Sequence, residues 1–179
     1  MTRIVRKVSA MGRQTRQAGY TLIEMVIVAS ILGISAAMVI PTLGATDVSR
    51  LKGAAEVLAA DLSAAQVESI AHGDDIRLML FDTENDTYYI AATSDTDTPI
   101  TNPIGNAAYQ VVFGQGSATQ FKGVTIQSVS VGGDDMLGFG VYGELDQTTA
   151  ATITLANNGK TITLSVEPYS GEVSIGEVE

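Results

Sequence analysis

The sequence of 179 residues contains no cysteine and no tryptophan, and its only histidine is His72. Without cysteine, disulfides, thiolate zinc sites and thiol nucleophiles are excluded. With one histidine, a histidine metal cluster is impossible and a Ser/His/Asp triad would rest on His72 alone. His72 falls at the end of a predicted helix, where an imidazole favours the helix dipole. We therefore expect no enzyme activity, no metal site and no cofactor.

Positive charge is scarce and concentrated at one end. There are 10 Lys and Arg residues against 20 Asp and Glu residues, and the first 19 residues contain no acid. Five of the basic residues lie in that segment: Arg3, Arg6, Lys7, Arg13 and Arg16. Without it, 5 basic and 20 acidic residues remain, so the formal net charge moves from −10 to −15. Such an acidic body repels phosphate backbones, and we expect no nucleic-acid partner.

A long hydrophobic segment follows the basic end. Residues 20–40 contain one acid and no base, and the acid is Glu24. As a helix, residues 20–43 would extend ~36 Å at about 1.5 Å per residue, which exceeds a hydrocarbon core of ~30 Å. The basic residues before it predict a cytoplasmic N-terminus, with everything after Pro41 on the other side of the membrane.

An ordinary secretory signal is the alternative interpretation of this end. It would use Ser35, Ala36 and Ala37 as a small-residue cleavage site. However, the apolar part of such signals usually spans about 7–15 residues and has no carboxylate at its start. A secretory signal and a plain membrane anchor both leave Glu24 unexplained.

Beyond Pro41 the apolar residues recur at steps of three or four, which predicts an amphipathic helix. The stripe consists of Val48, Leu51, Ala55, Leu58, Leu62 and Ala65. One helix is therefore predicted from about Tyr20 to Ala71, with a bend at Pro41 and with Gly73 as its C-terminal cap.

The rest of the chain has the pattern of short strands and turns. The predicted strands are 76–81, 87–92, 109–113, 124–131, 151–155, 160–166 and 173–175. Asn158 and Gly159 predict a tight hairpin turn, whereas the polar residues 93–108 predict an exposed loop. We expect an α+β fold in which the helix packs on an antiparallel β domain.

Two further motifs are weak. Residues 138–143 match G-x-G-x-x-G, but strand-like residues follow where a dinucleotide site needs a helix, so we expect turn and edge-strand glycines. The loop from Asp82 to Asp86 offers closely spaced oxygen ligands for calcium. It has Thr87 where a calcium loop needs glycine and Thr93 where it needs glutamate. A solvated hairpin turn is the prediction for this loop.

The most informative residues lie where the basic end meets the hydrophobic segment. Residues 19–24 read GYTLIE and are followed by the apolar run, Gly33 and Pro41. This pattern resembles the cleavage and methylation motif of type IV pilins and of the pseudopilins of type II secretion systems. Counted from Tyr20, Glu24 is the fifth residue, Gly33 the fourteenth and Pro41 the twenty-second, which match the family pattern. Tyr20 replaces the more common phenylalanine.

The resemblance implies a processing step and an assembly mechanism. A prepilin peptidase would cut after Gly19, and the new N-terminal residue, Tyr20, would be N-methylated. In the filament, Glu24 of an incoming subunit would face the positive N-terminal amine of its neighbour. A glutamate that snorkels at the membrane edge is the alternative role of Glu24. The implied assembly residues are Glu24, Leu22, Ile23 and Pro41.

The resemblance also divides the chain. Residues 1–19 would be the cleaved leader, 20–43 the hydrophobic transmembrane and assembly half-helix, 44–72 the amphipathic half-helix, and 73–179 a β-rich head. The protein would lie in the inner (cytoplasmic) membrane as a single-pass protein, with a cytoplasmic N-terminus and a periplasmic C-terminal domain. The implied partners are other pilin or pseudopilin subunits, the prepilin peptidase, the inner membrane and the secretion assembly platform.

Residues 64–71 end the predicted helix, residues 76–81 follow as a strand, and Phe139, Gly143 and residues 165–175 supply a C-terminal strand pair with a glycine-containing turn. In this pattern the rest of the chain also resembles the minor pseudopilins of the H type and related minor pilins of DNA uptake. The predicted function is that of a minor pseudopilin-like subunit of a type II secretion pseudopilus, which supports protein export. The alternative is a minor type IV pilin of a surface pilus, with a role in adhesion or DNA uptake. The DNA-uptake members carry Arg or Lys near the C-terminal turn, whereas Glu172, Glu177 and Glu179 lie there in this sequence, which favours secretion.

Overall fold

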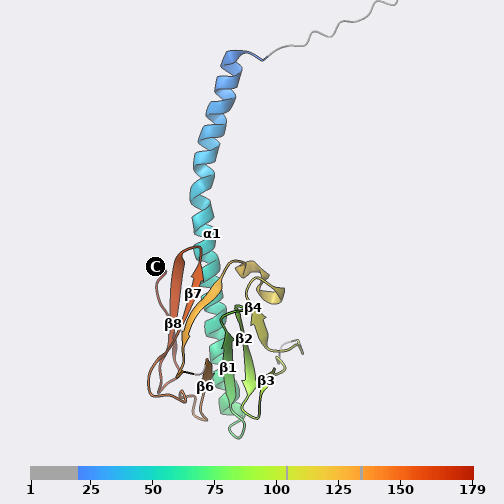
Figure 1. Cartoon of the computed structure of the whole chain (residues 1–179), viewed down its shortest axis with the longest axis vertical. Coiled ribbons are helices and arrows are strands. Elements are labelled where there is room, and N and C mark those ends of the chain that lie inside the picture. Colours follow the sequence, from blue (N-terminus) through green and yellow to red (C-terminus); the bar gives the residue numbers. More distant parts are fainter. Residues whose placement is uncertain (1–19, 104, 134) are drawn as a thin grey trace, which may run out of the picture. The chain divides into compact units, whose positions relative to one another are not determined.

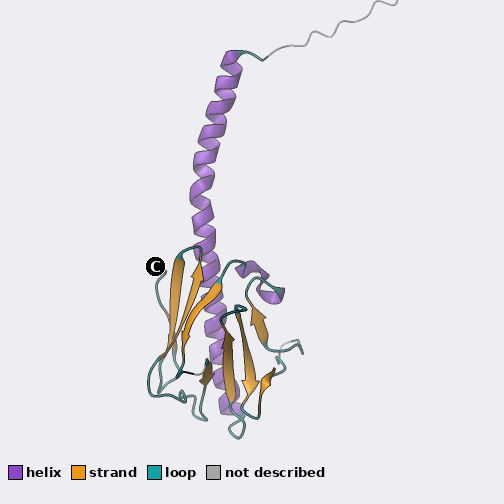
Figure 2. Cartoon of the chain, viewed as in Figure 1, coloured by secondary structure: helices purple, strands orange, loops and turns teal. Residues whose placement is uncertain are grey.

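A computed structural model describes residues 20–103, 105–133 and 135–179, with the side chains of all of them except 36–45. Its elements are one long helix, α1 (Leu22–Ala71), a short 3₁₀ helix and nine strands in two antiparallel sheets (Figures 1 and 2). Contacts divide the chain into two units, residues 1–41 and 42–179. The second unit, residues 42–179, is called the head.

The part of α1 in the head packs through one stripe. Its fully buried residues are Leu51, Ala54, Ala55, Leu58, Leu62 and Ala65. The predicted stripe is confirmed except at Val48, which is partly exposed. Burial of each leucine side chain stabilises the fold by about 1.5–3 kcal/mol. The spacing of these residues therefore determines which side of α1 faces the sheets.

The C-terminal end of α1 differs from the prediction. The helix ends at Ala71, as expected, but Gly73 does not adopt the left-handed conformation of a glycine cap. Instead, the N–H of Asp75 donates to the carbonyl of His72 at 2.8 Å. A Cβ at Gly73 would lie 3.3 Å from the Val141 side chain, so this glycine provides space for close packing rather than a cap.

The first sheet comprises five strands in the order β3-β2-β1-β6, with β4 also paired to β2. Their bounds are β1 Arg77–Asp82, β2 Thr87–Ala92, β3 Asp95–Pro99, β4 Gln110–Val112 and β6 Met136–Gly138. The prediction that residues 93–108 form a loop is wrong for β3. This strand is polar and largely exposed, and it pairs with β2 across an irregularity between Ala91 and Ala92. Backbone hydrogen bonds to β2 hold β3 in the sheet, so its sequence has no alternation of buried and exposed side chains from which the strand could be predicted.

The second sheet has the order β5-β7-β8-β9. Its strands are β5 Thr125–Ser130, β7 Ala151–Asn157, β8 Lys160–Val166 and β9 Val173–Ile175. The predicted hairpin between β7 and β8 is confirmed, because Asn157 pairs with Lys160 and both turn residues, Asn158 and Gly159, have positive φ. The 3₁₀ helix, Gly116–Phe121, precedes β5 and was not predicted.

The hydrophobic core lies between α1 and the two sheets, which sit side by side along the helix in the head (Figure 1). An aromatic row made by Tyr88, Phe113 and Phe121 extends through it, with ring centroids 5.7 and 6.3 Å apart. Polar contacts fix the far end of the helix, where the Gln66 amide donates to the carbonyls of Gly143 and Ser170, both at 2.8 Å. The predicted α+β fold with an antiparallel β domain is confirmed.

Candidate functional site: the N-terminal segment

The predicted processing and assembly residues lie at the start of α1. Gly19 and the rest of the basic end lie outside the described residues. Tyr20 is 78% exposed and lies two residues before the helix begins at Leu22. Pro41 lies within α1, which continues through it, but its side chain is outside the described set. The bend predicted at Pro41 stays a prediction.

Thr21 and Glu24 form a reciprocal cap at the helix start. The Thr21 hydroxyl oxygen accepts the N–H of Glu24 at 3.3 Å, and the Glu24 carboxylate accepts the N–H of Thr21 at 3.5 Å. Backbone N–H groups in the first turn have no partner within the helix, so such caps stabilise the end. The T-x-x-E spacing before an apolar run is the sequence signature of such a capping box, although the cap was not predicted above. The cap keeps Tyr20 and its backbone nitrogen outside the helix.

The apolar side chains of this segment are exposed. Their exposed fractions range from 48% at Val28 to 84% at Leu22. The set comprises Leu22, Ile23, Met25, Val26, Ile27, Val28, Ile31, Leu32 and Ile34. A helix that is apolar all round is stable only when lipid or other helices cover it.

Within the described residues, no helix meets the length and hydropathy needed to cross a membrane. The membrane-spanning role predicted for residues 20–43 is therefore unconfirmed.

Gly33 is unusual within this segment because no contact among the described residues requires a glycine there. A Cβ built at Gly33 would have no heavy atom within 4 Å, and its φ is not in the positive region. Glycine in a helix interior costs about 1 kcal/mol relative to alanine. A glycine that this chain does not need allows another helix to approach closely.

The two weak motifs have structural roles. Gly138 ends β6, Gly143 has a positive φ, and no helix begins at either, so the prediction of turn and edge-strand glycines is confirmed. The Asp82 carboxylate accepts the Asn85 side-chain amide at 2.7 Å and the backbone N–H groups of Asn85 and Glu84, both at 3.0 Å, and these bonds hold the pKa of Asp82 below its ordinary value. The hairpin turn is confirmed. In the described part of the chain, no three His, Cys, Asp or Glu side chains gather into a candidate metal site.

One polar cluster in the head was not predicted. Asp61, near the edge of the buried stripe of α1, accepts hydrogen bonds from the hydroxyls of Tyr88 at 2.6 Å and Tyr109 at 2.9 Å. Burial raises the pKa of Asp61, although both hydrogen bonds lower it. These residues meet only because α1 packs against β2 and against the segment before β4. Asp61 and Tyr109 lie 48 positions apart, so no local sequence pattern predicts the cluster.

Comparisons with known proteins agree with this geometry. Residues 14–40 match the family described as the prokaryotic N-terminal methylation motif. The chain is similar to the type IV minor pilin FimU of Pseudomonas aeruginosa in two crystal forms. The match to one crystal form has 20% identity and a TM-score of 0.50, and it covers 71% of this chain and 93% of the FimU chain. The match to the other has 20% identity and a TM-score of 0.53, and it covers 72% of this chain and 90% of the FimU chain.

The minor pseudopilin EpsH of the Vibrio cholerae type 2 secretion system is also similar. It has 14% identity and a TM-score of 0.53, and the match covers 71% of this chain and 96% of that chain. No curated protein sequence matches the chain.

The fold is similar to that of a type IV minor pilin and of a minor pseudopilin, and the N-terminal residues match a methylation motif. More particularly, the chain carries the N-terminal methylation motif of prepilin-type proteins, and its fold is that of two minor subunits. The motif is typical of proteins that a prepilin peptidase processes and that are anchored in a membrane. One similar structure is a type IV minor pilin and the other a minor pseudopilin of a type 2 secretion system, so the fold alone does not distinguish the two.

Proposed function

We propose that this protein is a minor pseudopilin-like subunit of a type II secretion pseudopilus. A prepilin peptidase cuts it after Gly19, and Tyr20 becomes the N-methylated first residue. The hydrophobic half-helix, residues 20–43, anchors it in the inner membrane with the head in the periplasm. It then joins the pseudopilus by helix packing that involves Leu22, Ile23 and Pro41. The protein is a structural subunit that supports protein export and not an enzyme.

The observation that carries this proposal is the environment of Glu24. Its carboxylate lies in the first turn of an exposed apolar helix, where a charge within a membrane costs on the order of 2.5–3.5 kcal/mol at mid-bilayer. Its hydrogen bond to the Thr21 N–H is long, at 3.5 Å, and a carboxylate has about four acceptor positions. Glu24 therefore retains capacity for a cation, and cleavage after Gly19 would create one at the Tyr20 nitrogen of a neighbouring subunit.

The acidic C-terminus favours export over DNA capture. Glu172, Glu177 and Glu179 are all exposed. Two backbone hydrogen bonds between Glu179 and Thr161 hold the end of the chain against β8. This surface repels a phosphate backbone. A surface-pilus subunit that binds DNA remains the alternative, and a gel-shift measurement on the full-length protein in detergent at physiological salt separates the two: clear DNA binding would support the alternative.

Replacement of Glu24 tests the assembly role. The variant Glu24→Ala should be cleaved and should fold its head normally, but it should be absent from purified filaments. Glu56→Gln, a change at an exposed glutamate in the head part of α1, is the control and should be incorporated as the wild type is. Incorporation of Glu24→Ala at the wild-type level would contradict the proposal.

A further inference from the structure

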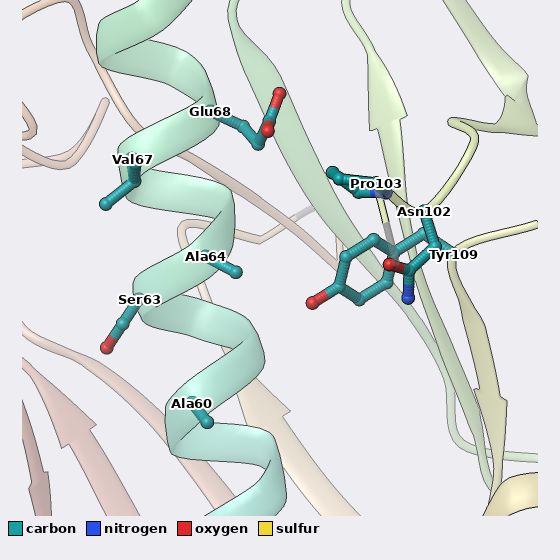
Figure 3. Close-up of a pocket in the computed structure, with 8 residues that line it drawn as sticks. All are labelled: Ala60, Ser63, Ala64, Val67, Glu68, Asn102, Pro103 and Tyr109. Atoms are coloured by element: carbon teal, nitrogen blue, oxygen red, sulfur yellow. The ribbon is translucent and has the colours of Figure 1, made fainter. Parts of the chain in front are cut away.

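A groove lies along the outer side of α1 in the head, between the helix and the segment that leads into β4. Its volume is about 360 Å³. Figure 3 shows Ala64 and Glu68 of the helix facing Pro103 and Tyr109 across it, whereas Ser63 and Val67 point away along its rim. The lining residues are Ala60, Ser63, Ala64, Val67, Glu68, Asn102, Pro103 and Tyr109.

The helix wall of this groove is apolar although it faces outward. Ala60 and Val67 are exposed, and the Val67 side chain is 62% exposed. The outward face of a surface helix usually carries charged or polar residues. Ala60 and Ala64 are small and lie one turn apart, which leaves room for a second backbone to approach. This face has the character of an interface and not of a solvated surface.

The groove lining carries one carboxylate, and an adjoining cavity carries a second. Glu68 lines the groove directly, and Asp61 lines the adjoining cavity of about 500 Å³, which shares Asn102 and Tyr109 with the groove. Among the described residues that line the two cavities there is no Lys, Arg or His. The ring of His72, outside this lining, lies 3.3 Å from the Glu68 carboxylate. Two carboxylates in partly desolvated positions favour an occupant with positive charge.

Tyr109 links the two carboxylates. Its hydroxyl donates to Asp61, which fixes the ring as the wall between the two cavities. The face of a tyrosine ring attracts a Lys or Arg side chain within about 6 Å. The groove therefore combines small apolar residues, an aromatic wall and the Glu68 carboxylate, with the Asp61 carboxylate in the adjoining cavity.

We propose that this groove receives an apolar segment of a different subunit of the filament, and that the segment presents an Arg or Lys side chain to Glu68, Asp61 and Tyr109. This inference rests on the proposed function, because it needs a neighbouring subunit. A second copy of the head is a poor occupant: residues 42–179 contain 5 basic and 19 acidic residues, a formal charge of −14, and two such heads repel each other.

Site-specific cross-linking tests the proposal in cells that make the filament. A photoreactive benzoylphenylalanine at Ala60, an exposed residue that lines the groove, is placed in the full-length protein, and the linked peptides are identified by mass spectrometry. We expect one main partner, a different filament subunit, joined at a segment with a Lys or Arg within a few residues. Adding Glu68→Gln should lower the cross-link yield by up to about fivefold, the upper end of the loss measured for a solvent-accessible charge pair.

The matched control is Glu56→Gln, which removes the same charge from the same helix outside the groove and should leave the yield unchanged. No cross-link, a linked segment without a basic residue, a link to a second copy, or equal yields for the two variants would each overturn the inference. The mature N-terminus, read from the same samples, separates this failure from that of the proposed function. A protein that begins at Tyr20 and enters filaments but gives no such cross-link refutes the groove alone.

Discussion

The two parts of α1 with described side chains, residues 22–35 and residues 46–71, share one secondary structure but differ in what surrounds them. Leu32 in the first part is 64% exposed, whereas Leu62 in the second is fully buried. The first part is apolar on all sides, and the second has a single buried stripe that both sheets cover. The second part is therefore stabilised inside its own chain, while the first depends on lipid or on other subunits. A pair of matched substitutions separates these two kinds of dependence.

The largest expected effect on stability is that of Leu62→Ala. It removes a fully buried side chain from the core, and such a truncation costs about 2–5 kcal/mol of unfolding free energy. Leu32→Ala is the matched change in the exposed part and should leave that free energy almost unchanged while it weakens incorporation into filaments. Denaturant unfolding of both full-length variants in detergent is the measurement. Equal losses of stability would contradict the comparison.

A smaller loss is expected for Gly171→Ala, which probes how the head holds the end of α1. Gly171 has a φ of +64°, and a Cβ there would collide with the carbonyl oxygen of Gly143 and the amide of Gln66. Strain of this kind costs on the order of 1–3 kcal/mol. Gly159→Ala is the control, since it also has a positive φ but nothing within 4 Å of the added Cβ. It should cost less in the same unfolding measurement, and an equal cost would show that the contact with Gln66 is unimportant.

Gly33→Ala should separate stability from assembly in the exposed part. The change has no steric cost within the chain and should favour the helix by about 1 kcal/mol, because alanine is the better helix former. If another helix packs closely at Gly33, the variant should still enter filaments less efficiently than the wild type. Quantification of the variant in purified filaments checks this, and wild-type incorporation would remove Gly33 from the interface.

The smallest effect is a pH dependence from Asp61. The pKa of Asp61 is raised in the folded state, so its charged form is less favourable there than in the unfolded chain. The stability that Asp61 contributes is therefore largest at low pH and falls as the pH rises above the unfolded pKa of 3.8. The stability of the wild type relative to Asp61→Asn should therefore increase as the pH is lowered from about 7 towards about 4. Melting temperatures of the two proteins across this range measure the difference. A difference in melting temperature that does not change with pH would mean that burial does not raise the pKa of Asp61.

Local patterns in the sequence predicted most of α1 and most strands. The spacing of Leu51, Leu58 and Leu62 determines the buried face, and the Asn158-Gly159 turn determines the β7–β8 register. The polar strand β3 was missed because backbone pairing with β2, not alternating burial, holds it.

The same distinction applies to the sites. The motif around Glu24 is contiguous, so the sequence alone identified it, even though its cap with Thr21 was overlooked. By contrast, Asp61 meets Tyr88 and Tyr109 only through tertiary packing, and Pro103 forms a groove wall only because its loop lies beside α1. No local signal encodes these contacts.

The mass of the mature N-terminal peptide from purified filaments tests the central claim most directly, because pairing with Glu24 requires a free amine at the next subunit's first residue. The account predicts a peptide that begins at Tyr20 and carries one added methyl group. A peptide that begins at Met1, or one cut near Ala37, would contradict it, because neither leaves an amine beside the cap formed by Thr21 and Glu24.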